Sequence, residues 1–150
     1  MTIRLVSRVV IYQKGKLLLV RNKNENFWYP PGGAWNYEKE NIIEAAIREV
    51  KEETGLNVRI LRMLYVQEFH PLPDTVFFES FWLAEPLPGQ VLDKNHTDLD
   101  PSGQVGAIEW FSKDQTSILK VFPKRLKNTF WNRIQKIKNE EDPFIGVSWS

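Results

Sequence analysis

Three glutamates in one short segment have the residue type and the spacing to bind a metal cation. Glu52 and Glu53 follow Glu49 by three and four residues. On a helical wheel of about 100° per residue with Glu49 at zero, Glu52 falls at roughly 300° and Glu53 at roughly 40°, so the three carboxylates share one wedge about 100° wide. Carboxylates at these spacings repel each other. A Mg²⁺ ion, which takes carboxylate oxygens, would offset that repulsion.

The ends of the segment and its apolar stripe predict a helix. Asn41 can cap it, with Glu44 as the reciprocal capping partner, and Gly55 can end it. The wedge next to the glutamates contains Ile43, Ala46, Ile47, Val50 and Thr54, and is the expected core side. By itself, this helix is better explained as an ordinary charged surface, because Glu is a good helix former and Arg48 and Lys51 can supply ordinary ion pairs.

The residues before the helix change this balance. Gly32-Gly33-Ala34-Trp35-Asn36-Tyr37-Glu38-Lys39-Glu40, seven further residues and Arg48-Glu49-Val50-Lys51-Glu52-Glu53-Thr54-Gly55-Leu56 form one continuous pattern. It resembles the signature of the Nudix hydrolases, in which Gly, five residues, Glu and seven residues precede Arg-Glu-apolar-any-Glu-Glu-any-Gly-apolar. Every fixed position from Glu40 to Leu56 matches.

The match departs from the family pattern at its first glycine. The spacing places that glycine at position 34, where this sequence has Ala34, and Gly33 lies one residue too early. Either the loop contains one extra residue or Ala34 replaces the glycine. We favour the insertion, because Pro31-Gly32-Gly33 after an aromatic segment is similar to the usual approach to the family's signature.

The resemblance implies the fold, the reaction and the roles of the site residues. The implied fold is α+β, a Nudix-type α/β/α sandwich with a mixed sheet flanked by helices. The implied reaction is Mg²⁺- or Mn²⁺-dependent hydrolysis, with water attacking phosphorus in the diphosphate bridge of a nucleotide sugar, an ADP-ribose-like compound or a nucleoside triphosphate. By position, Glu49, Glu52, Glu53 and the backbone of Gly33 or Ala34 are the expected metal ligands. Glu40 and Arg48 are expected to pair and hold the loop onto the helix.

The general base is not fixed by the pattern, since family members use either a signature glutamate or a carboxylate on a later loop. Asp98 and Asp100 are candidates for the loop role, and Glu79 is a weaker one. Gln104 occupies a position that is often acidic in the family, which disfavours a loop base. We expect His70 and His96 to be exposed loop residues without a catalytic role.

The rest of the chain predicts a sheet with flanking helices. Strands are expected over residues 4–11, 16–20, 27–29, 58–66, 76–84 and 107–111. Residues 30–33 are expected to form a rigid loop with exposed backbone, and residues 86–103 a long polar loop. Apolar residues at three- and four-residue steps predict an amphipathic helix over residues 119–137, interrupted or started near Pro123.

Composition limits the function classes. The chain has 150 residues, the size of a single domain over 1–150, and a formal charge of +1, so no global basic excess favours nucleic acid or an anionic membrane. With no cysteine, a disulfide framework, a thiolate nucleophile and a Cys-ligated zinc are excluded. No stretch has the roughly 20 apolar residues of a membrane span, and no signal peptide is recognised. We expect a cytoplasmic protein without a membrane partner.

The diphosphate hydrolase implied by the resemblance would act on a small nucleoside diphosphate-type substrate and could form a homodimer, as many relatives do. Two other hypotheses remain beside it. One is a catalytically silent nucleotide-binding or regulatory domain, which the shifted glycine keeps open. The other is an RNA 5′-end pyrophosphohydrolase, although nucleic acid is the less favoured partner. It would use the basic residues Lys120, Lys124, Arg125, Lys127, Arg133, Lys136 and Lys138, which ordinarily form a solvated face.

Overall fold

The computed structural model describes residues 1–149, except for the side chain of Lys138, so this member of the basic run lies outside the description. Six strands form one sheet: β1 (Thr2–Gln13), β2 (Lys16–Asn22), β3 (Gly32–Ala34), β4 (Val58–Leu72), β5 (Thr75–Pro86) and β6 (Val105–Ser112). The helices are α1 (Ile42–Thr54), α2 (Lys113–Ile118) and α3 (Thr129–Arg133), with 3₁₀ turns η1 (Lys94–Leu99), η2 (Lys124–Lys127) and η3 (Ile137–Asn139).

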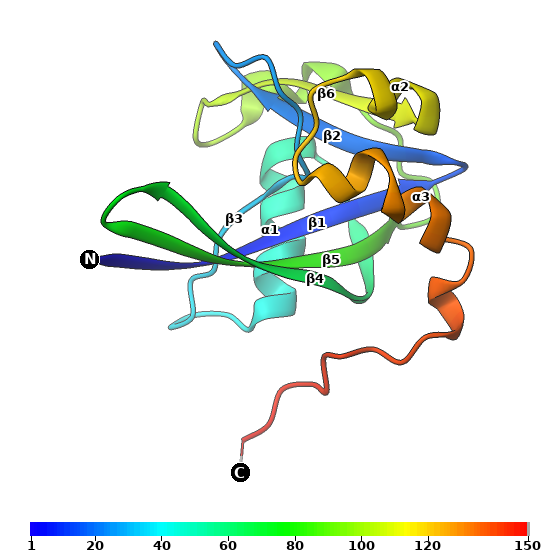
Figure 1. The fold of residues 1–150 in the computed structure, drawn as a ribbon. Helices are drawn as coiled ribbons and strands as arrows, with labels where there is room; N and C mark the ends of the chain where they lie inside the picture. Colours follow the sequence, from blue (N-terminus) through cyan, green and yellow to red (C-terminus); the bar gives the residue numbers. More distant parts are fainter. Residues whose placement is uncertain (150) are drawn as a thin grey trace.

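The sheet is mixed, as predicted. Its strand order is β4-β5-β1-β2-β6, and β3 pairs with β1 beside this path. β1 runs parallel to β5, while its pairings with β2 and β3 are antiparallel. β4 and β5 form a long hairpin whose turn lies beside the N-terminus, where Thr2 N donates to Asp74 O at 2.7 Å (Figure 1). This hairpin continues well beyond the two strands predicted for it.

Alternation along the central strands explains the layers, because successive strand residues point to opposite faces. One face packs against α1 through Val9, Ile11, Leu18, Trp82 and Ala84. The other packs against the C-terminal segments through Val10, Leu17, Leu19, Phe81 and Leu83. Both faces are therefore covered, with α1 behind the sheet and α3 in front of it in Figure 1. The expected α/β/α sandwich is confirmed.

Helix α1 begins and ends as the sequence indicates. The Asn41 side chain accepts from Glu44 N at 2.9 Å, and Asn41 N donates to Glu44 Oε1 at 3.0 Å, which completes a capping box. Gly55 adopts a left-handed conformation with φ 75°, and its N–H bonds to Lys51 O. Both ends of the helix that holds the glutamates are thus fixed locally.

The loop predicted over residues 30–33 is partly wrong. Gly32–Ala34 forms the short strand β3, which pairs with Val6–Arg8 of β1 in antiparallel register. A Cβ on Gly32 would lie 2.2 Å from Ser7 O and 2.6 Å from Arg8 Cα. The two strands approach this closely only because glycine has no side chain.

The helix predicted over residues 119–137, interrupted or started near Pro123, is only partly confirmed. The segment folds as η2, the five-residue α3 and further turns, with η2 starting after Pro123. Asn128 separates η2 from α3 with φ −141° and ψ −84°, which no helix accommodates. The periodic apolar residues nevertheless reach the core, since Leu126, Phe130, Ile134 and Ile137 are buried.

Two smaller expectations change as well. Residues 27–29 make only isolated bridges, Val20↔Tyr29 and Trp28↔Val121, rather than a strand. The long loop over residues 86–103 contains η1, whose His96 ring nitrogen lies 2.9 Å from Glu52 O at the end of α1. Within residues 1–149, no helix combines the length and apolar composition that crossing a membrane requires.

The contact between β3 and β1 can be tested by adding one methyl group. Gly32→Ala is expected to cost more than about 3 kcal/mol in free energy of unfolding, because the added carbon meets backbone atoms that cannot move aside. Gly33→Ala is the control, since the three atoms nearest to its Cβ would all belong to the Glu49 carboxylate, at 2.7 Å, which is the end of a flexible side chain. Urea denaturation measures both, and equal losses would contradict the assignment.

Candidate active site

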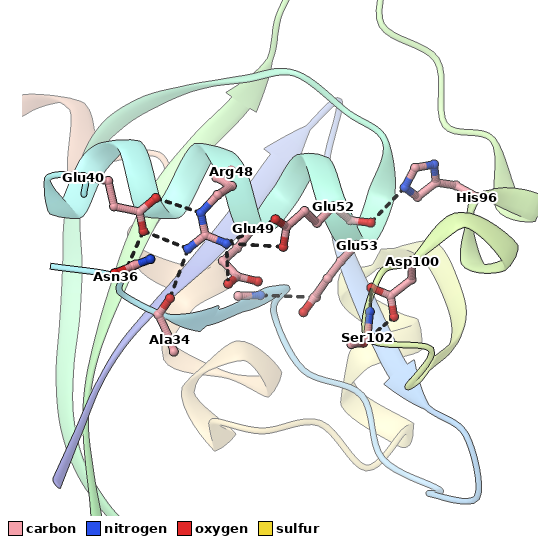
Figure 2. A network of polar contacts seen from close by, with 11 residues as sticks. Ala34, Asn36, Glu40, Arg48, Glu49, Glu52, Glu53, His96, Asp100 and Ser102 are labelled. Atoms are coloured by element: carbon pink, nitrogen blue, oxygen red, sulfur yellow. Dashed lines mark hydrogen bonds and ion pairs between the residues drawn. The ribbon is translucent and has the colours of Figure 1, made fainter. Parts of the chain in front are cut away.

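The predicted pair between Glu40 and Arg48 is present. Arg48 Nε lies 2.7 Å from Glu40 Oε1, and its Nη2 lies 2.8 Å from Oε2, a bidentate contact (Figure 2). Glu40 Oε2 also accepts from Asn36 N at 3.0 Å, and Arg48 Nη2 donates to Ala34 O at 3.2 Å. The pair therefore fixes the loop between β3 and α1 against the helix.

The three expected metal ligands lie on one side of α1, where Glu49 and Glu52 share one partner and Glu53 has another. Arg48 Nη1 is 3.0 Å from Glu49 Oε1 and 3.3 Å from the carboxylate oxygens of Glu52. Glu53 points instead toward β3 and accepts from Gly32 N at 3.3 Å (Figure 2). Within the described part of the chain, no three acidic or histidine side chains are grouped as a ready metal cage. The expectation that all three converge is therefore only partly met.

Gly33 lies directly against this acidic group. A Cβ at position 33 would be 2.7 Å from the Glu49 carboxylate carbon and both of its oxygens. Ala34, by contrast, is exposed, and its carbonyl is held by Arg48. The backbone that faces Glu49 is thus that of Gly33, which supports the interpretation that the loop after Gly33 contains one extra residue.

The electrostatics of the carboxylates differ sharply. Burial, reinforced by the Glu49 charge, raises the pKa of Glu53 to about 8, although Arg8 and the Gly32 N–H act in the opposite direction. Burial also raises the pKa of Glu49, against the effect of Arg48. The hydrogen bonds from Arg48 lower the pKa of Glu40 despite its burial. Glu40 is therefore the carboxylate whose ionised form is stabilised, whereas burial destabilises the ionised forms of Glu49 and Glu53.

The donor set and its surroundings fit a hard divalent cation. Carboxylate oxygens beside a glycine backbone are the ligands that Mg²⁺ and Mn²⁺ prefer. A cation bound here would stabilise the ionised forms of Glu49 and Glu53. Because Gly33 has no Cβ, space remains next to Glu49. The residues that could hold it are Glu49, Glu52, Glu53 and Gly33.

A large cleft begins at this acidic group. It has a volume of about 1310 Å³, and Gly32, Gly33 and Glu53 line one part of it. The cleft continues along the sheet between the β4–β5 hairpin and η2, past Tyr29, Tyr65 and other aromatic residues. A space of this size accommodates a nucleotide derivative. The sequence did not reveal this cleft, because the residues that line it come from segments far apart in the chain.

The later loop offers no free carboxylate for the base role. Asp100 accepts from Ser102 Oγ at 2.6 Å and from the N–H groups of Ser102, Gln104 and Val105. These hydrogen bonds lower the pKa of Asp100 although its burial acts to raise it, so Asp100 organises the loop. Asp98 is exposed on η1, away from the cleft lining. Glu79 does line the cleft but is paired with Arg8.

The two histidines have different surroundings. His70 is exposed, as expected, and pairs with Glu68 at 2.6 Å. His96 is not a free loop residue, because its ring contacts the Glu52 carbonyl and would lie 2.8 Å from a Cβ on Gly55. It therefore docks η1 onto the C-terminal end of α1, which no local pattern around His96 indicates.

Comparison with known proteins identifies the family. The NUDIX domain profile matches residues 2–131, so the chain belongs to this family. It is 39% identical over 70 residues to an 8-oxo-dGDP phosphatase of Danio rerio, covering 45% of this chain and 21% of that protein. It is 31% identical over 87 residues to an RNA pyrophosphohydrolase of Haemophilus influenzae, covering 58% and 38%. The chain thus matches well under half the length of these curated relatives.

The fold comparison agrees. A NUDIX hydrolase structure from Nitrosomonas europaea superposes with a TM-score of 0.69 at 20% identity, covering 97% of each chain. At this identity the likeness concerns the fold. It confirms the mixed sheet and flanking helices inferred from the resemblance.

The Glu40–Arg48 pair predicts a pH-dependent contribution to stability. Because the pKa of Glu40 is lowered in the folded chain, its stabilising effect is present above the unfolded value of 4.5 and is lost as pH falls through the folded value. Glu40→Gln should therefore lower stability by about 1–3 kcal/mol at neutral pH. Thermal melts should show the difference shrinking in acid, and a pH-independent difference would argue against the pair.

The contribution of Glu53 to stability should depend on pH in the opposite direction. Between its ordinary pKa of 4.5 and the folded value of about 8, the folded chain keeps a proton that the unfolded chain releases, so stability falls as pH rises. Glu53→Gln removes this loss. In metal-free buffer its gain in melting temperature over the wild type should grow between about pH 5 and about pH 8.5. A gain in melting temperature that does not change with pH would show that the pKa of Glu53 is not raised by burial.

Proposed function

We propose that this protein is a Mg²⁺-dependent hydrolase that cleaves the diphosphate linkage of a nucleoside diphosphate derivative. The observation that carries the proposal is that Gly33 lies against the Glu49 carboxylate while Gly33 and Glu53 line one part of a nucleotide-sized cleft. The NUDIX profile match and relatives named for phosphatase and pyrophosphohydrolase activities support it.

Each residue has a distinct task in this proposal. Glu49, Glu52 and Glu53 would hold the cation, with the Gly33 backbone beside them. A bound divalent cation neutralises phosphate oxygens, orients the bridge and lowers the pKa of water. Arg48 Nη1, now on Glu49 and Glu52, can give up these carboxylates while Nε and Nη2 remain on Glu40. The Glu40–Arg48 fork thus keeps the loop in place while the carboxylates change partners.

The cleft supplies binding for the rest of the substrate. Its aromatic lining suits the nucleoside portion, since aromatic rings stack on bases. We favour a small-molecule substrate. An RNA 5′ end is a second candidate, because Lys124 and Arg125 line the cleft and one relative is an RNA pyrophosphohydrolase. Salt-sensitive cleavage of a 5′-triphosphorylated oligonucleotide would favour this candidate.

A substrate panel with one variant tests the proposal. The wild type is incubated with Mg²⁺ and with nucleotide sugars, ADP-ribose, nucleoside triphosphates and a 5′-triphosphorylated RNA, and the released phosphate or nucleotide is measured. Glu53→Gln is expected to lower turnover at least about a thousandfold, because a neutral amide does not replace a metal-binding carboxylate. Unchanged turnover would contradict the metal assignment.

Glu44→Gln is the matched control for this variant. Glu44 lies on the same helix but faces solvent, and glutamine preserves the capping box. Its activity should equal that of the wild type. If the wild type releases nothing from any compound while still binding nucleotides, the catalytically silent binding domain becomes the better description.

A further inference from the structure

An ion pair in the wall of the cleft is not explained by the acidic group or by folding. Arg8 on β1 donates through Nε to the Glu79 carboxylate on β5, with Arg8 21% and Glu79 4% exposed. Exchanging a buried ion pair for apolar residues is often neutral or stabilising. Stability alone therefore gives little reason to place this pair in the wall of the cleft.

Arg8 is held in one orientation from several sides. Gln67 Nε2 donates to the second Glu79 oxygen at 3.3 Å, so the carboxylate that holds Arg8 is itself oriented. The Arg8 guanidinium also lies over the Tyr29 ring, 5.3 Å from its centroid. Its backbone pairs with Gly32 in the register of β1 and β3. Arg8 therefore lies beside Gly32, with its side chain fixed by Glu79 and Tyr29.

The position of Arg8 relative to the acidic group suits a shared ligand. Both Arg8 and Glu53 line the cleft, and Gly32 touches both, through its N–H to Glu53 and its close approach to Arg8. Among the described residues, the hydrogen bonds of Arg8 engage Nε and, at 3.5 Å, Nη1 toward Pro30 O. A guanidinium has five N–H groups in a fork that matches phosphate oxygens.

We propose that Arg8 is a phosphate-positioning residue, oriented by Glu79 and Tyr29, which binds non-bridging oxygens of the diphosphate whose other oxygens face the metal ligands. The inference rests on the proposed function and adds a residue outside the family signature. Glu79 then serves to aim Arg8, which explains why this carboxylate lines the cleft without being free to act as a base.

A double variant tests this without leaving a buried charge unpaired. In Arg8→Gln, Glu79→Gln, two amides replace the ion pair, so a failure to fold is less of a risk than with either single change. The control is Arg59→Gln, Glu85→Gln, a cross-strand ion pair on the exposed end of β4 and β5 outside the cleft lining. Arg8→Lys is the second variant, because it keeps the charge but loses the fork.

Binding is measured separately from catalysis. The probe is methylenediphosphonate, a diphosphate mimic that is not hydrolysed, titrated calorimetrically in the presence of Mg²⁺, and Mn²⁺ binding is followed alone. The cleft variant should bind the probe at least about tenfold more weakly than the wild type and the control, with Arg8→Lys in between and Mn²⁺ affinity unchanged. For active protein, KM should rise more than kcat falls.

Two results would overturn the proposal. One is equal probe affinity in the wild type and the cleft variant, and the other is no detectable probe binding to the wild type. If the double variant of Arg8 and Glu79 fails to fold, Arg8→Lys is compared with the wild type instead. Equal probe affinity in these two proteins would again overturn the proposal. Absence of hydrolysis with the probe still bound through Arg8 would refute the proposed hydrolase activity but support the positioning role.

Discussion

Arg48 joins groups from three segments of the chain, and the rest of the site depends on this contact. Its guanidinium holds Glu40 in the loop, the Ala34 carbonyl of β3, and Glu49 and Glu52 on α1. Only a planar group with donors on several edges can do this. The contact fixes the distance between strand and helix, and therefore places the glycine backbone beside the glutamates.

The two glycines extend this constraint to the sheet. Gly32 permits β3 to lie against β1, and Gly33 permits it to lie against Glu49. The acidic side of α1 and the wall of the cleft consequently meet at one corner, although α1 packs on the opposite face of the sheet. Arg8 and Glu79 also line this cleft, so under the proposed function a diphosphate would lie between the proposed metal ligands and a fixed positive charge.

The acidic residues fall into two groups: those whose ionised form is destabilised by burial, and those that hold the loops in place. Glu40 has a lowered pKa and serves as a fixed anchor, while burial raises the pKa values of Glu49 and Glu53. Asp100 has satisfied hydrogen bonds and orders its loop. A cation would stabilise the ionised forms of Glu49 and Glu53, whereas Glu40 and Asp100, which hold the loops, already have hydrogen-bond partners.

The sequence alone was enough to predict helix α1, its two caps and the shared side of the three glutamates, because helical period and capping depend on residues close in the chain. The Glu40–Arg48 pair was expected only from the resemblance to the family signature. The same resemblance also indicated the sandwich. The sequence did not determine that residues 32–34 form a strand, that the C-terminal helical segment is interrupted again at Asn128, that His96 docks on α1, or that Arg8 and Glu79 meet in the cleft. These features depend on contacts between distant segments, such as β1 with β3 and β5, and local pattern contains no information about which distant partner a residue will meet.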